Sequence, residues 1–80
     1  MTPIGNKKMR CVYSISVSGK KIIYIGLTGY FERRMRDHLK DSPEILKLIK
    51  EYGRNLIITK QLTKYILAEE AIKIEGKLIN

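Results

Sequence analysis

The feature that most constrains the fold is a pair of short runs rich in β-branched and aromatic residues, separated by a turn signal. The first run covers 11–17, the second covers 21–27, and a Ser-Gly pair lies at 18–19. This pattern predicts a β-hairpin. A two-residue loop and a four-residue loop centred on that pair both place Tyr13 directly opposite Tyr24.

The two predicted partners, Tyr13 and Tyr24, lie on one face of the hairpin because side chains alternate along a strand. Opposed residues have Cβ atoms about 4.5–5.5 Å apart, so the two rings belong to one site. A cross-strand aromatic pair that only stabilises the hairpin is one interpretation. The other is that paired phenols beside a run of arginines belong to a reaction site.

Length and cysteine content restrict the class of protein. A chain of 80 residues forms one small domain, which buries only about 60% of its unfolded surface. The single cysteine, Cys11, cannot close an internal disulfide, and a cysteine inside a strand is more often a buried apolar residue than a nucleophile. No signal peptide and no apolar run of about 20 residues is present. We therefore expect an intracellular, cytoplasmic and soluble protein without a membrane partner.

The positive charge of the chain is concentrated in its first half. Residues 1–40 hold nine basic against two acidic side chains, whereas residues 41–80 hold seven against six. The formal net charge is +8. One-sided charge of this kind favours a surface for nucleic-acid phosphates, although anionic lipid or solubility would give the same count.

Beyond the hairpin, the pattern predicts two helices, a strand and a last helix. We expect a loose arm over 1–9 and a single domain over 10–80. The predicted helices cover 30–40, 43–52 and 66–79, and the third strand covers 56–62. The order β-β-α-α-β-α predicts an α/β protein of the α+β type, with a three-stranded sheet covered by helices.

Two residues of the first predicted helix lie at the edge of its apolar stripe. At about 100° per residue, Arg34 and His38 lie beside the apolar arc, where side chains can lean over the sheet. Arg33, Arg36 and Lys40 lie on the opposite face, which is typical of a solvated surface. A surface or capping role for His38 and a functional role remain equally open.

The last helix contains a carboxylate where an apolar residue is expected. Glu75 lies inside the apolar arc, between Ile72 and Ile79. Burying an unpaired carboxylate costs several kcal/mol, so this position predicts a cation, hydrogen-bond donors or a metal nearby. The alternative is a residue near the helix end whose side chain reaches solvent.

These residues, in this order, resemble the GIY-YIG endonuclease domain, above all the compact modules of phage-type homing endonucleases and of excision-repair nucleases. Cys11-Val12 replaces Gly-Ile in the first triplet, but the tyrosine is kept. The resemblance covers nearly all of 11–80. Its elements are Cys11-Val12-Tyr13, Tyr24-Ile25-Gly26, Thr28, Arg34, His38 and Glu75.

The resemblance implies a three-stranded antiparallel sheet and hydrolysis of a DNA phosphodiester with one Mg²⁺, or Mn²⁺ as a substitute, held by Glu75 and waters. It implies that Tyr13 or Tyr24 is the general base, and we favour Tyr13 with Tyr24 as its hydrogen-bonding partner. It also implies that Arg34 stabilises charge on the phosphate and that His38 assists by hydrogen bonding. No small-molecule cofactor is expected. The alternative is a non-catalytic nucleic-acid-binding module of the same fold.

Overall fold

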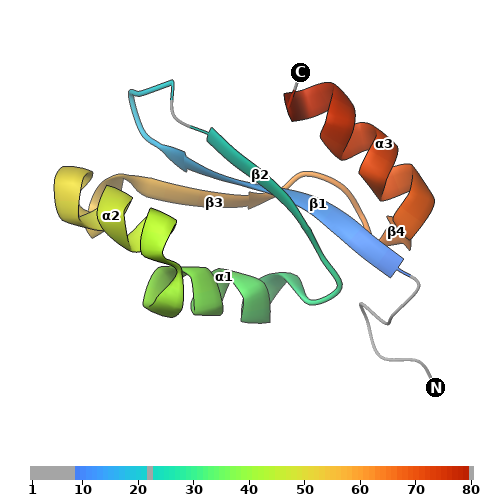
Figure 1. Cartoon of the computed structure of the whole chain (residues 1–80), viewed down its shortest axis with the longest axis horizontal. Helices are drawn as coiled ribbons and strands as arrows, with labels where there is room; N and C mark the ends of the chain where they lie inside the picture. The colour runs from blue at the N-terminus through green and yellow to red at the C-terminus, as the bar shows by residue number, and fades with distance from the viewer. Residues whose placement is uncertain (1–8, 22, 80) are drawn as a thin grey trace.

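The computed structural model describes residues 9–21 and 23–79, which form an antiparallel sheet and three α-helices (Figure 1). Residues 1–8 of the predicted arm lie outside the described residues, and Met9 already begins the first strand. In chain order the elements are β1 (Met9–Val17), β2 (Ile23–Thr28), α1 (Phe31–Asp41), α2 (Pro43–Tyr52), the 3-10 turn η1 (Arg54–Leu56), β3 (Ile57–Gln61), β4 (Ile66–Leu67) and α3 (Ala68–Ile79).

The sheet has the order β2-β1-β3, so β1 is the central strand and β2 is an edge strand. The predicted α+β class and sheet are confirmed, with the short strand β4 as one addition. Its two residues, predicted as the start of the last helix, instead pair with Met9 and Arg10. Their β-branched and apolar side chains suit this pairing, which extends the sheet just before α3 begins.

The helices cover both faces of the sheet. Figure 1 shows α1 and α2 together on one side of the strands and α3 on the other. The core lies beneath α1 and α2, and α3 packs against β1 and β2. Full burial of an aliphatic side chain stabilises the fold by about 1.5–3 kcal/mol. The buried members of this core are Tyr13, Ile15, Val17, Met35, Ile45 and Ile57.

The predicted hairpin register is wrong by two residues. Tyr13 is opposite Gly26, and Tyr24 is opposite Ile15. The turn closes between Val17 and Lys20, where the Lys20 amide donates to the Val17 carbonyl at 3.0 Å, and the Ser18 amide donates to the Leu56 carbonyl at 2.8 Å. The observed register also places Gly26, the smallest residue of β2, against the Tyr13 ring.

The two-residue shift preserves the prediction that the two tyrosines share a face. Side chains alternate with a period of two, so only a shift by one residue would send a tyrosine to the other face. Tyr13 and Tyr24 are therefore diagonal rather than opposed neighbours. Over the part of the chain that the structure describes, no helix has the length and apolar character needed to cross a membrane.

Candidate active site

The centre of the candidate site is a buried pair formed by Tyr13 of β1 and His38 of α1. The Tyr13 hydroxyl lies 2.8 Å from Nε2 of His38. The two side chains are only 2% and 8% exposed, so water does not separate them. His38 is therefore a core residue rather than a surface or capping one. Tyr24 is the partner expected for the Tyr13 hydroxyl from the family resemblance, and the structure adds His38 as a partner.

Aromatic packing fixes the orientation of this pair. The Tyr13 and Tyr24 ring centroids are 6.3 Å apart with an interplanar angle of 29°, and the Tyr24 ring meets His38 edge-on at 5.3 Å. Phe31 packs edge-on against Tyr13 at 6.4 Å. Offset and edge-to-face pairs of this kind contribute about 0.5–1.5 kcal/mol each beyond their burial. The phenols thus stabilise the hairpin and also hold a defined geometry.

Gly26 allows the Tyr13 ring to cross the edge strand. A Cβ built on Gly26 would lie 2.5 Å from Cζ of Tyr13 and closer still to its hydroxyl oxygen. No side chain fits in that space. Since β2 is the edge strand, the absence of a Cβ lets the phenol reach the margin of the sheet, where side chains of other elements can approach it.

We predict that Gly26→Ala destabilises the fold by about 1–3 kcal/mol, because the new methyl group must displace the Tyr13 ring. Urea unfolding would measure the change. The matched control is Gly76→Ala, because a Cβ at this position of α3 meets nothing within 4 Å. That variant is expected to gain up to about 1 kcal/mol from helix propensity. Equal effects of the two substitutions would contradict the close-approach argument.

The environment of Tyr13 keeps its phenol protonated. Burial raises the pKa of Tyr13 well above its ordinary value, and the neighbouring Tyr24 phenol raises it further. The Arg34 guanidinium acts in the opposite direction, and the Glu75 carboxylate raises the pKa by a smaller amount. At neutral pH, Tyr13 therefore carries its proton and needs an acceptor within hydrogen-bonding distance before it can act as a base.

His38 is kept neutral by the same surroundings. Burial lowers its pKa below the ordinary 6.5, and the nearby Arg34 guanidinium lowers it further. Glu44 and Asp37 partly oppose this shift. A neutral imidazole has one unprotonated ring nitrogen, so His38 can accept a proton from the Tyr13 hydroxyl.

The depressed pKa of His38 predicts a loss of stability in mild acid. Below pH 6.5 the unfolded chain binds a proton at this imidazole more readily than the folded protein does. The free energy of unfolding should therefore fall as the pH drops through that value, and His38 should contribute no pH dependence above it. Urea unfolding of the wild type and His38→Gln from about pH 8 to about pH 5 would test this. Parallel stability curves for the two proteins would contradict it.

Arg34 connects the buried pair to the surface. Its side chain is exposed, and it borders one hollow together with His38 and a second hollow together with Thr28 and Tyr30. Because it influences the pKa of both Tyr13 and His38, its charge lies within electrostatic range of both. A guanidinium in this position can meet an anion that approaches the phenols.

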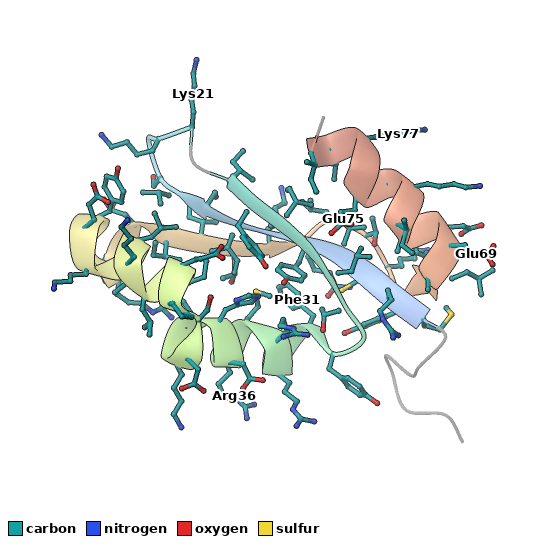
Figure 2. The ribbon with its side chains drawn as sticks, in the orientation of Figure 1. Lys21, Phe31, Arg36, Glu69, Glu75 and Lys77 are labelled. Carbon is teal, nitrogen blue, oxygen red and sulfur yellow. The ribbon has the colours of Figure 1, made fainter. Side chains whose placement is uncertain are left out.

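Glu75 approaches the same phenol from α3. Its side chain is half-buried, and its charge acts on the pKa of Tyr13. Figure 2 shows Glu75 on the side of α3 that faces the strands, whereas Glu69 and Lys77 point away from them. The structure thus brings Tyr13, Tyr24, Arg34, His38 and Glu75 to one region from four elements.

The donor set is consistent with a hard divalent cation that keeps most of its water. No group of three or more His, Cys, Asp or Glu side chains that could hold a metal occurs within residues 9–21 and 23–79. A zinc site needs such a group. Mg²⁺ can instead be held by one or two carboxylates, waters and substrate oxygens. Glu75 offers one half-buried carboxylate beside the phenols, which fits that coordination.

The hydroxyls of Thr28 and Tyr65 hold the start of α1 in place. The Tyr65 hydroxyl accepts a hydrogen bond from the Phe31 amide at 2.9 Å, and the Thr28 hydroxyl accepts one from the Tyr30 amide at 3.0 Å. Tyr65 also hydrogen-bonds the buried Cys11 thiol, whose pKa is raised mainly by burial. Thr28 was noted only as part of the family pattern, and no periodicity in the loop before β4 indicates Tyr65.

Comparison with known protein families agrees with this arrangement. Residues 9–80 match the GIY-YIG catalytic domain, a nuclease-type catalytic module. Because the match covers nearly the whole chain, the protein belongs to the GIY-YIG family. Membership implies a nucleic-acid substrate and a divalent metal. Neither the curated proteins nor the solved structures include a significant match to the chain.

Proposed function

We propose that the protein is a divalent-metal-dependent endonuclease that hydrolyses phosphodiester bonds of DNA. The observation that carries the proposal is the buried hydrogen bond between Tyr13 and His38, with Arg34 and Glu75 in electrostatic range of the same phenol. Packing alone does not require this combination, because a phenylalanine in place of Tyr13 would fill the core equally well. A proton acceptor, a cation and a carboxylate at one phenol are the groups that phosphodiester hydrolysis uses.

Tyr13 acts as the general base through His38. In the resting state the hydroxyl proton of Tyr13 points to Nε2 of a neutral His38 whose own proton is on Nδ1. As the attacking water donates a proton to the phenol oxygen, the original hydroxyl proton moves to Nε2, and the water oxygen forms the new bond to phosphorus. The bond to the leaving oxygen breaks, and that oxygen takes a proton from solvent. The relay avoids a free phenolate, which the raised pKa of Tyr13 disfavours.

Arg34 stabilises the phosphate in this reaction. Its guanidinium can bind two non-bridging oxygens in a fork geometry and offset the charge that develops as water adds. Its charge also keeps His38 neutral in the resting state, so that an unprotonated ring nitrogen faces the Tyr13 hydroxyl. Tyr24, stacked at 6.3 Å from Tyr13, orients the phenol.

Glu75 is the residue that would hold the divalent metal. When bound, Mg²⁺ would supply positive charge to the phosphate and the departing oxygen. The carboxylate of Glu75, half-buried on α3 and acting on the Tyr13 pKa, is the group that would hold this ion. Mn²⁺ has the same preference for oxygen ligands and is expected to replace it.

Cleavage of plasmid DNA tests the proposal. Purified protein should convert supercoiled plasmid to nicked or linear forms with Mg²⁺ or Mn²⁺ and should not do so in a chelator. Salt-sensitive binding without any cleavage in either metal would contradict the proposal and favour the alternative, a binding module without chemistry.

A further inference from the structure

A hollow beside the candidate active site shares only Arg34 with the residues of the proposed reaction. It has a volume of about 240 Å³ and lies where β2 passes into α1. This is below the roughly 300–1,000 Å³ of pockets for drug-sized ligands, so it suits a small group. Its lining residues are Thr28, Tyr30, Arg33, Arg34 and Asp37.

The charges in this hollow favour an anion. Arg33 and Arg34 both line it and both are exposed, against the single carboxylate of Asp37. Two guanidiniums from consecutive positions diverge by about 100° around a helix, so they face the hollow from different directions. Arginine forks match phosphate oxygens better than any other side chain does.

The hollow adjoins the phenols through two shared residues, Arg34 and Asp37. Arg34 lines it and also lines the neighbouring hollow that contains His38. Arg33 lines the first hollow and has no place in the second. An anion bound by Arg33 would therefore lie next to a phosphate at the phenols, but separate from it. Adjacent phosphates of a nucleic-acid strand have this relation.

We propose that this hollow binds a second backbone phosphate, neighbouring the one that is cleaved, and that Arg33 is its main ligand. The inference rests on the proposed function, because it adds a substrate contact to the same site. The ring of Tyr30, 46% exposed at the rim, offers a flat surface for the sugar or base between the two phosphates. Asp37 weakens the site, so the contact positions the strand rather than dominating affinity.

Binding of small nucleotides tests the inference without requiring cleavage. The probes are thymidine 3′,5′-bisphosphate and thymidine 5′-monophosphate, titrated into the full chain and followed by NMR chemical shifts. We expect the wild type to bind the bisphosphate roughly fivefold more tightly than the monophosphate, as for one partly exposed ionic contact. In Arg33→Gln this preference should disappear, so that the two nucleotides bind about equally tightly. Asp37→Asn, which removes the opposing charge, should increase it.

The matched control is Arg36→Gln, which removes the same charge from the same helix at a residue that does not line the hollow. It should retain the wild-type ratio. Equal ratios in the Arg33 and Arg36 variants, or a wild type that does not distinguish the two nucleotides, would overturn the inference. Neither result would affect the proposed function, which stands or falls on plasmid cleavage by the wild-type protein.

Discussion

Glu75→Gln is expected to lower the rate of metal-dependent cleavage by about 10³-fold while the fold and DNA affinity remain near those of the wild type. Glutamine keeps the size of the side chain and removes only its charge. The half-buried carboxylate of Glu75 acts on Tyr13, whose phenol is neutral at neutral pH. The two residues therefore form no ion pair that the substitution would break. Losing the charge of Glu75 should therefore change the free energy of unfolding little. The divalent metal ion, in contrast, would lose the carboxylate that holds it beside the phosphate.

The control for this substitution is Glu69→Gln on the same helix. Glu69 is exposed and points away from the strands (Figure 2), so its loss should leave the rate unchanged. Manganese adds a second readout: paramagnetic Mn²⁺ should broaden the NMR signals of Tyr13 and Tyr24 in the wild type and in Glu69→Gln, but not in Glu75→Gln. Retained cleavage in Glu75→Gln would contradict the assigned role.

The sequence predicted the elements of this fold better than their pairing. Strands and helices follow from local periodicity, which is why α1, α2 and α3 were found within a few residues of their ends. Periodicity does not fix the hairpin register, because a shift by two residues leaves every side chain on the same face of the sheet. Strand β4 is not predicted for a similar reason. A strand of two residues is too short to show an alternating pattern, and its partner, Met9–Arg10, is distant in the sequence.

The sequence predicts which face of a helix each site residue occupies, but it does not predict how deeply that side chain is buried. The spacing of Arg34 and His38 at the edge of an apolar stripe indicated one face for both, and the structure has His38 hydrogen-bonded to Tyr13 and Arg34 within electrostatic range of it. The spacing could not show that His38 is buried while Arg34 is exposed, because that difference depends on how closely α1 packs against the Tyr13 ring. Glu75 is a candidate from the sequence because spacing places its carboxylate inside an apolar arc. Burial of an unpaired carboxylate there would cost several kcal/mol, so a partner is expected.

Tyr13→Phe is expected to reduce cleavage by about 10²–10⁴-fold, the range associated with loss of a general base. The ring and its stacking on Tyr24 remain, so stability should fall only by about 1 kcal/mol for the lost hydrogen bond to His38. Rates from plasmid cleavage and unfolding by urea would measure the two quantities. The matched control is Tyr52→Phe, since Tyr52 packs against the same core from α2 and lies under Lys20 at 5.7 Å. It should keep full activity.

A double substitution separates the proton relay from simple packing. If the hydroxyl proton of Tyr13 moves to His38, then His38→Gln removes the acceptor and lowers the rate in an otherwise intact site. In the Tyr13→Phe background there is no proton to accept, so adding His38→Gln should change the rate little, as for residues that act as one unit. Independent roles would instead multiply the two losses. Because Tyr24 stacks on the same ring at 6.3 Å, Tyr24→Phe should show a smaller loss than Tyr13→Phe, and the reverse order would make Tyr24 the base.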